Sequence, residues 1–513
     1  IPPRGRFVLV FRTVDAGTFR PPFFSGIMTV AAVNETDAPH SSGNTERIHN
    51  AMYRCTKKIC TRCGACSGLG VLSKPLRGLS SSPVSAEAAL SRAFSAAIDL
   101  GTTTLACYLA GVPDGRILGA ASARNPQASR GPDVVSRIVR ASESQQALQE
   151  LSDIVRNHIG ALAANLAGDA GLDVRNCREI AVAGNSVMEL LFLGISPESL
   201  GSAPFSLPAR SFAPLSVEEL EIPFLPPETP VHIFPLIDGF VGGDTTALLY
   251  EITEAAVLSG TQALTRLVID FGTNGEIALI HGGRIVACST AAGPAFEGAS
   301  IRHGMPALPG AVSAVVSDGG ATYCRTVNNK PAIGLCGSGL VDAVALLLRE
   351  GVLREDGMME RRPASPFARR IRREGEEPRC VLCESEAGEV ALYQSDVRQF
   401  QLAKGAVQAG IELLLSHCGV AWEEIGECVL AGAFGNAIRH ESLLETGVLR
   451  GLLRDKIRSA GNGAGMGIVR MLGAGASGRR RVHRIAESAG HLRLESAPEF
   501  QPRFLEAMRL APR

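Results

Sequence analysis

The 513-residue sequence has no net charge, because 51 lysine and arginine side chains balance 51 aspartate and glutamate side chains. Without a basic excess, no field recruits nucleic acid or an anionic membrane. No apolar run reaches the ~18 residues that a membrane-spanning helix needs. The first residues also lack the cationic segment, apolar core and cleavage site of a secretion signal. We therefore expect a cytoplasmic protein that binds neither nucleic acid nor membranes.

An initiator methionine is also missing, since the sequence begins at Ile1. Residues 1–51 contain two short apolar pieces, "FVLVFRTV" and "GIMTVAAV", followed by the turn-rich "DAPHSSGNTE". No periodicity links these pieces into a folded unit. We expect this segment to be disordered or to lie outside the native product, with Met28 or Met52 as the alternative start.

Most of the thirteen cysteines are scattered, which fits a reducing compartment without a disulfide framework. Four are instead gathered in "RCTKKICTRCGAC", namely Cys55, Cys60, Cys63 and Cys66. The run Cys60-x2-Cys63-x2-Cys66 fits a compact [4Fe-4S] site, whereas Cys55-x4-Cys60-x2-Cys63 matches plant-type [2Fe-2S] spacing. Four such thiolates can also enclose zinc. We favour [4Fe-4S], with [2Fe-2S] and zinc as the alternatives.

A second cysteine pair, Cys380-x2-Cys383, lies in the polar stretch "EEPRCVLCESEAG". No further pair lies near it in the sequence, and a zinc site of this kind needs two. We therefore predict a surface hairpin here and no metal site.

From about residue 95 the chain alternates apolar strands, glycine turns and helices. One pattern occurs twice, as "AIDLGTTTLACYL" at 97–109 and "VIDFGTNGEIALI" at 268–280. Each copy reads as a strand that ends in Asp-x-Gly-Thr and then returns as a second strand. The repeat predicts two similar halves that each open in this way.

The repeated turn has the groups that bind a polyphosphate. Glycine lets the backbone approach an anion, and Thr and Asn offer hydroxyl, amide and main-chain N–H donors. Asp99 and Asp270 lie at strand ends, where a carboxylate can hold hydrated Mg²⁺ or orient water. A single such turn is common, and the pairing is what favours nucleotide binding. The residues predicted to contact the phosphates are Gly101, Thr102, Thr103, Gly272, Thr273 and Asn274.

A third motif, "VLAGAFGN" at 429–436, is a strand that ends in small residues. Without bulky side chains, Gly432, Ala433 and Gly435 would let a nucleoside lie against the backbone. Two further stretches, "GFVGGDTTALLYEI" and "GNGAGMGIVRML", place small residues on one helical face. We expect these two helices to cross closely and to form a hinge.

The order of these motifs resembles the superfamily of acetate and sugar kinases, heat-shock chaperones, hexokinases and actin. The stretches "AVAGNSVMELLFLG", "GLCGSGLVDAV", "QFQLAKGAVQAGIELLL" and "EFQPRFLEAM" resemble the ATP-dependent reductive activators of corrinoid proteins, over residues 95–513. The resemblance implies an α/β, two-lobed actin-like ATPase fold with duplicated ribonuclease H-like halves, after a small cysteine-rich metal-binding segment. The expected segments are an N-terminal segment (1–51), the iron–sulfur cysteine cluster (52–70), a linker (71–94), a first lobe (95–250) and a second lobe (251–513).

The same resemblance implies a function, the ATP-dependent one-electron reduction of Co(II) to Co(I) in a corrinoid protein that supports methyl transfer. ATP, Mg²⁺ and an iron–sulfur cluster at the four cysteines are the implied cofactors, and Asp99 and Asp270 the catalytic residues. The implied partners are a corrinoid iron–sulfur protein or corrinoid methyltransferase subunit and a low-potential donor such as ferredoxin, with a homodimer as one assembly. The alternatives are a regulatory or chaperone-like ATPase, or a small-molecule kinase, with a structural metal at the cysteines.

Overall fold

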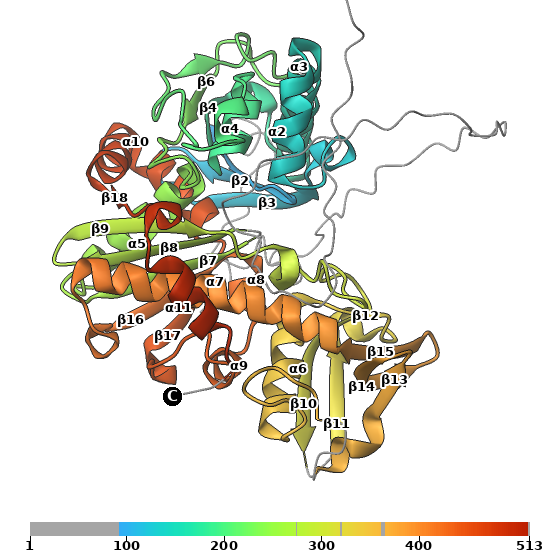
Figure 1. Ribbon diagram of the computed structural model, residues 1–513. Helices are drawn as coiled ribbons and strands as arrows, with labels where there is room; N and C mark the ends of the chain where they lie inside the picture. Colours follow the sequence, from blue (N-terminus) through green and yellow to red (C-terminus); the bar gives the residue numbers. More distant parts are fainter. Residues whose placement is uncertain (1–91, 273, 319–320, 361–364, 511–513) are drawn as a thin grey trace, which may run out of the picture. The chain divides into compact units, whose positions relative to one another are not determined.

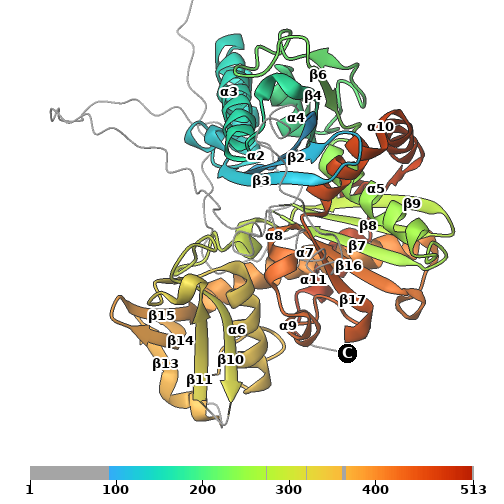
Figure 2. The same ribbon diagram turned by 180° about the vertical axis from the view of Figure 1, so that it is seen from behind.

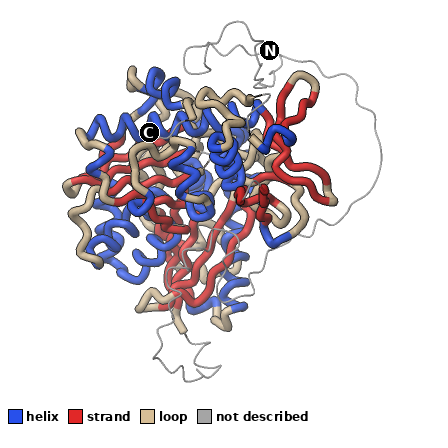
Figure 3. The backbone as a smooth tube through the Cα atoms, turned by 90° about the horizontal axis from the view of Figure 1, so that it is seen from below, coloured by secondary structure: helices blue, strands red, loops and turns tan. Residues whose placement is uncertain are grey.

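The computed structural model describes residues 92–272, 274–318, 321–360 and 365–510 (Figure 1). Two six-stranded sheets form the framework of this part of the chain. Figure 3 shows the strands with helices packed alongside them. Within the described ranges, no helix combines the length and the apolar character needed to cross a membrane.

The first sheet has the strand order β3-β2-β1-β4-β6-β5. From β1 the chain returns antiparallel as β2 and then as β3, whereas β4 lies parallel to β1 on its other side. The strands are β1 (Phe94–Leu100), β2 (Thr104–Gly111), β3 (Ile117–Arg124), β4 (Cys177–Gly184), β5 (Leu215–Ser216) and β6 (Pro230–Ile233).

The second sheet repeats this arrangement, in the order β17-β16-β7-β8-β9-β18. The strands β7, β8 and β9 form an antiparallel meander, and β16 lies parallel to β7. The strands are β7 (Arg266–Phe271), β8 (Gly275–His281), β9 (Arg284–Thr290), β16 (Glu427–Ala431), β17 (Ile457–Gly461) and β18 (Gly490–His491). The predicted α/β fold with two similar halves is confirmed, since both sheets place a parallel strand beside the first strand of a meander.

Both faces of each central strand are buried. In β1, Ile98 belongs to the core beneath α3 (Gln145–Asp169), while Ala97 belongs to a separate core with α10 (Gly463–Ser488). In β7, the alternate residue Val268 packs against Leu248 of α5 (Gly243–Leu258). The helices α5 and α10 contact each other, and both contribute side chains to the core with Ala97 and to the core with Val268.

The crossing of α5 and α10 depends on glycine. A methyl group at Gly463 would overlap the side chain of Leu248, and one at Gly467 would overlap the carbonyl group of Ala247. A side chain at either position would therefore force the helices apart. The predicted close crossing of these two stretches is confirmed.

The Gly467→Ala variant should consequently lose about 1–3 kcal/mol of unfolding free energy, because the added methyl group meets backbone that cannot rotate away. A matched control is Gly168→Ala in α3, where a methyl group would have no neighbour within 4 Å. That substitution should stabilise the protein by about 0.4–1 kcal/mol, because alanine restricts the unfolded chain. Chemical denaturation of both variants measures the contrast, and equal stabilities would contradict the close crossing.

Two small sheets lie between β9 and the long helix α7 (Gln394–Cys418) in the sequence (Figure 2). The first sheet packs on α6 (Gly337–Arg349), and the second leads directly into α7. The strands are β10 (Ala311–Asp318), β11 (Ala321–Thr326), β12 (Gly334–Leu335), β13 (Ile371–Glu374), β14 (Glu377–Ser385) and β15 (Gly388–Tyr393). In Figure 1, α7 runs from these strands along the second large sheet, where it contacts β8 and β9.

The C-terminal helix α11 (Phe500–Ala507) is fastened to α7 by a buried lysine. The Lys404 ammonium group donates to the carbonyl oxygens of Ala507 (2.5 Å) and Arg509 (2.6 Å), and to Gln408 Oε1 (2.6 Å). Three donors thus meet three acceptors, so the buried ammonium group is fully hydrogen-bonded. The stretches "QFQLAKGAVQAGIELLL" and "EFQPRFLEAM" therefore pack against each other.

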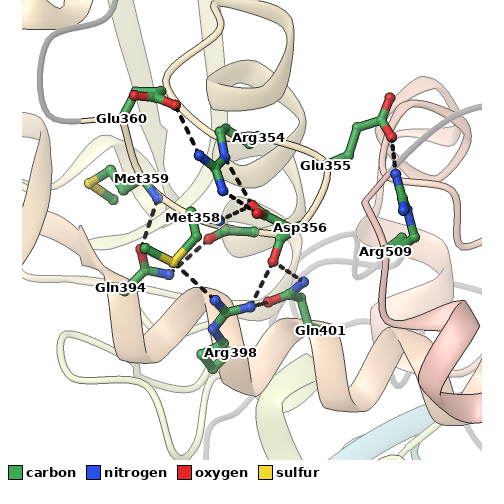
Figure 4. A network of polar contacts seen from close by, with 11 residues as sticks. Arg354, Glu355, Asp356, Met358, Met359, Glu360, Gln394, Arg398, Gln401 and Arg509 are labelled. Atoms are coloured by element: carbon green, nitrogen blue, oxygen red, sulfur yellow. Dashed lines mark hydrogen bonds and ion pairs between the residues drawn. The ribbon is translucent and has the colours of Figure 1, made fainter.

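The same face of α7 holds the loop that follows α6, as Figure 4 shows. Arg398 Nη1 (2.7 Å) and Gln401 Nε2 (3.1 Å) both donate to the carbonyl oxygen of Asp356. The Leu510 N–H group in turn donates to the carbonyl oxygen of Glu355 (2.7 Å). The loop after α6 is thereby hydrogen-bonded both to α7 and to the end of the described chain.

Candidate active site

The strand ends that carry the two predicted turns lie near each other, since the charge of Asp99 acts on Asp270. Asp99 and Asp270 occupy the penultimate positions of β1 and β7. Burial raises the pKa of each carboxyl to about 7, and the charge of Asp99 contributes to the shift at Asp270. In the second turn, the Gly272 N–H group donates to the Asn274 carbonyl oxygen (3.0 Å), while Thr273 lies outside the described residues.

Three further carboxylates adjoin this pair. Asp244 lies in the first turn of α5, and burial raises its pKa to about 6. Glu276 lies directly opposite Asp270 in the β7–β8 ladder, and burial together with the charges of Asp244 and Asp270 raises its pKa well above the usual value. The pKa of Glu189 is also raised well above the usual value, by burial and by Asp244, although the Gly184 N–H group donates to its Oε1 (2.9 Å).

This acidic cluster, defined as Asp99, Glu189, Asp244, Asp270 and Glu276, has no cationic partner within the described part of the chain. The Oε2 atom of the fully buried Glu189 has no hydrogen-bond partner there either. Five carboxyl groups held together without a counter-charge are costly. They indicate a place for a bound cation.

Both crossing helices begin at this cluster. Asp244 is the second residue of α5, and Asn462 is the N-cap of α10, where its Oδ1 accepts from the Gly465 N–H group (2.7 Å). The Asn462 Nδ2 group donates to Asp99 Oδ2 (2.7 Å). A shift of the carboxylates would therefore be passed directly to the two helices that pack between the sheets.

The first turn is braced from inside its lobe. The carbonyl oxygen of Gly101 accepts from Asn125 Nδ2 (2.9 Å), that of Thr102 accepts from Arg137 Nη2 (2.7 Å), and that of Thr103 accepts from the Asn125 N–H group (2.8 Å). Because these three successive carbonyl oxygens already accept hydrogen bonds, they do not repel an anion at the turn. The fixed main chain suits phosphate binding.

The predicted nucleoside loop abuts the second turn. Gly432 has a φ of +79°, and a Cβ atom there would lie 2.5 Å from Asp270 Oδ1, so only glycine fits. Gly432, Ala433 and Gly435 all belong to the short helix α8 (Gly432–Ala437). The ring of Phe434 packs edge-on against Phe271 (5.3 Å between centroids), which fixes α8 beside β7.

The structure thus brings together the two aspartates, the described residues of both turns and the Gly432 loop. The sequence prediction missed Asp244, Glu276, Glu189 and Asn462. Asp244 lies within "GGDTT", a stretch that we interpreted only as a helix crossing, and Glu276 directly follows the second turn. The four clustered cysteines lie outside the described residues, so their role as metal ligands stays a prediction.

The acidic cluster predicts how stability depends on pH. Its folded-state pKa values of about 6 to 7 lie above the usual value near 4, so the nucleotide-free protein should lose stability as the pH rises from 4 to 7. Stabilisation by Mg²⁺ with a non-hydrolysable ATP analogue should instead grow over this interval, because a cation binds the deprotonated carboxylates. Melting temperatures at pH 5 and 8, with and without the analogue, test this. An analogue effect that is equal at both pH values would contradict it.

Comparison with known families accounts for this arrangement. Residues 94–253 match the family described as the RACo middle region, and residues 264–513 match the family described as the C-terminal domain of RACo, the ASKHA domain. The two matches adjoin each other and cover most of the chain.

Two curated proteins are similar in sequence. The corrinoid activation enzyme RamQ of Eubacterium limosum is 34% identical over 386 residues, which are 72% of this chain and 63% of RamQ. A reductase of a Co(II) methylated amine-specific corrinoid protein from Methanosarcina barkeri is 28% identical over 252 residues, 44% of this chain and 42% of the reductase. The chain thus spans less than two thirds of the length of either relative.

A solved structure agrees in fold as well as in sequence. It is titled a reductive activator for a corrinoid, iron–sulfur protein, and it superimposes with a TM-score of 0.71 at 30% identity, over 82% of this chain and 66% of its own. The predicted actin-like fold is confirmed by this match and by the ASKHA family. The chain belongs to the family of reductive activators of corrinoid proteins, of which it carries the middle region and the ASKHA domain.

Proposed function

We propose that this protein uses ATP to drive the one-electron reduction of Co(II) to Co(I) in a corrinoid protein, and so restores it for methyl transfer. The observation that carries the proposal is the acidic cluster, which has no cationic side-chain partner among the described residues and at which both crossing helices begin. A nucleotide bound there would act on the helices that pack between the two sheets. The names of the relatives supply the corrinoid partner.

The acidic cluster fits hydrated Mg²⁺. No three His, Cys, Asp or Glu side chains among the described residues converge closely enough to enclose a bare metal ion. Mg²⁺ keeps several of its waters and is commonly held through one or two carboxylates and the substrate's phosphates. Asp99, Asp244 and Asp270 would hold such an ion through its waters, and the ion would neutralise charge on the phosphates.

The remaining roles belong to the protein's own groups. The turns at Gly101–Thr103 and Gly272–Asn274 would hold the phosphates through main-chain N–H groups and side-chain hydroxyl and amide groups. The start of α8, at residues 432–435, would hold the nucleoside beside Asp270. Asn462 keeps Asp99 oriented by its 2.7 Å hydrogen bond, so any movement of Asp99 pulls on the start of α10. Deprotonated Asp99 or Asp270 would orient the attacking water.

Electron transfer is the task of the cysteine segment. Cys55, Cys60, Cys63 and Cys66 would hold an iron–sulfur cluster, for which we favour [4Fe-4S] over [2Fe-2S]. Held by these four cysteines, such a cluster would supply one-electron transfer between a low-potential donor such as ferredoxin and Co(II). For one electron, a change of 59 mV in reduction potential changes the equilibrium constant of the reduction tenfold. Nucleotide binding would assist by favouring a docked state in which cobalt is easier to reduce.

The protein partner in this proposal is a corrinoid iron–sulfur protein or the corrinoid subunit of a methyltransferase. A second copy of the chain, as a homodimer, would be compatible with this scheme. We expect little reduction without nucleotide, because the proposal couples a nucleotide-driven conformational change to the electron transfer.

Anaerobic purification followed by iron, sulfide and zinc analysis tests the redox half of the proposal. We expect about four irons per chain, and an electron paramagnetic resonance signal after reduction with dithionite. Zinc without iron would overturn the redox function. The chain would then be a nucleotide-driven switch with a structural metal at the cysteines.

A further inference from the structure

Two cysteines from separate small sheets meet within the insertion between β9 and α7. Cys324 lies in β11 and Cys383 in β14, and these two strands contact each other. Both side chains are half-buried and pack against the same large hydrophobic cluster. The two thiols lie near enough for the ionisation of each to affect that of the other.

A β-bulge explains why Cys383 faces this way. The β14–β15 register shifts between Val381 and Cys383. Val381 packs on one face of the hairpin with Ala391 and Tyr393, whereas Leu382 faces the large cluster. An extra residue turns the following side chain, so Cys383 joins Leu382 on the cluster side. The hairpin predicted from the sequence is present, but its cysteines pack against the large hydrophobic cluster and do not lie at the surface.

A guanidinium group stands beside Cys383. Arg370 Nη1 donates to the carbonyl oxygen of Leu382 (2.8 Å), the residue before Cys383. The hydrogen bond from Cys324 and the positive charge of Arg370 together hold the pKa of Cys383 below its usual value. Burial instead raises the pKa of Cys107 and of Cys418. A thiolate is the reactive form of cysteine, so Cys383 is the activated partner of the pair.

We propose that Cys383 and Cys324 form a redox-active dithiol, with Cys383 as the attacking thiolate and Cys324 as the resolving thiol. The co-reactant is a disulfide of low molecular mass such as glutathione disulfide. This inference is independent of the corrinoid function.

The proposed reaction is an ordinary thiol–disulfide exchange in two steps. The Cys383 thiolate attacks one sulfur of glutathione disulfide, which forms a mixed disulfide and releases one glutathione thiolate. Cys324 then loses its proton and attacks the Cys383 sulfur, which releases the second glutathione. Two protein thiols are oxidised to one disulfide, and one glutathione disulfide is reduced to two thiols.

The product would covalently connect two sheets that contact each other but share no strand pairing. The sheet with β11 packs through β10 on α6, and the sheet with β14 leads through β15 into α7. A covalent bond between them removes their freedom to move apart. Oxidation should therefore stiffen the insertion and raise the melting temperature of the intact chain by several degrees.

Peptide mapping of the intact chain tests the proposal independently of any reaction at Cys55 to Cys66. With iodoacetamide at pH 7, Cys383 should be alkylated at least tenfold faster than Cys418, which is also half-buried. Glutathione disulfide should yield a peptide that links Cys324 to Cys383. In the Cys324→Ser variant, the reaction should stop at glutathionylated Cys383, whereas Cys418→Ser should leave the cross-link unchanged.

The opposite results would overturn the proposal. If Cys383 is alkylated no faster than Cys418 and no linked peptide forms, the pair is a packed contact without redox chemistry. A cross-link that survives in the Cys324→Ser variant, through another cysteine, would show that Cys324 is not the resolving thiol.

Discussion

ATP hydrolysis is expected to fall about 10²–10³-fold in the Asp270→Asn variant, while the nucleotide-free protein becomes more stable to heat. Asn has the shape of Asp without its charge, so the variant loses the group that would hold hydrated Mg²⁺ or orient water. At pH 8 it also loses a repulsion, because the half-buried Asp270 lies near Asp244 and Asp99 and has a pKa of about 7. Steady-state phosphate release and melting temperature, measured on the same preparation, test both halves.

A buried aspartate outside the acidic cluster supplies the matched control. Asp396 in α7 accepts from the main-chain N–H groups of Arg302 (2.8 Å) and Tyr393 (2.9 Å) through its two oxygens. Asp396→Asn replaces one acceptor by a donor, so it should lower the melting temperature and leave hydrolysis almost unchanged. If Asp270→Asn behaved like this control, with lower stability and full activity, Asp270 would have a structural role only.

Co(II) reduction is expected to be abolished in the Cys60→Ser/Cys63→Ser variant, while ATP hydrolysis continues. Every iron–sulfur arrangement that the spacing allows uses both of these cysteines, so the variant should lose its cluster whichever type it is. The residues that we propose for ATP hydrolysis lie elsewhere in the sequence, in the two turns and the acidic cluster. Iron content, phosphate release and the corrinoid absorption spectrum test the separation of the two activities.

Cys418→Ser is the control for that variant, since this residue lies at the end of α7 and outside both sites. It should retain its iron and both activities. Reduction that persists in the double variant would mean that the electron reaches cobalt by another route, and the iron–sulfur role of the segment would be wrong.

Much of the fold follows from local patterns in the sequence. The repeated Asp-x-Gly-Thr stretches identify two equivalent meanders, because alternating apolar residues and glycine turns are short-range signals. The helix crossing follows from glycines whose missing side chains make room for Leu248 and Ala247. These predictions needed no knowledge of distant contacts.

The missed site residues depend on contacts between distant segments. Asn462 reaches Asp99 across 363 positions of sequence, and Asp244 reaches the cluster only because α5 begins there. Nothing near either residue in the sequence distinguishes it from an ordinary helix start. The pairing of Cys324 with Cys383 likewise depends on a bulge and on two sheets that the sequence does not place together.

Anaerobic absorption spectroscopy of a Co(II) corrinoid protein, mixed with this protein and a low-potential reductant, tests the central claim most directly. We predict that Co(I) accumulates with Mg²⁺ and ATP, and that little forms when the nucleotide is left out. The Asp270→Asn variant should match the reaction without nucleotide. Equal yields of Co(I) with and without ATP would contradict the coupling between the acidic cluster and electron transfer.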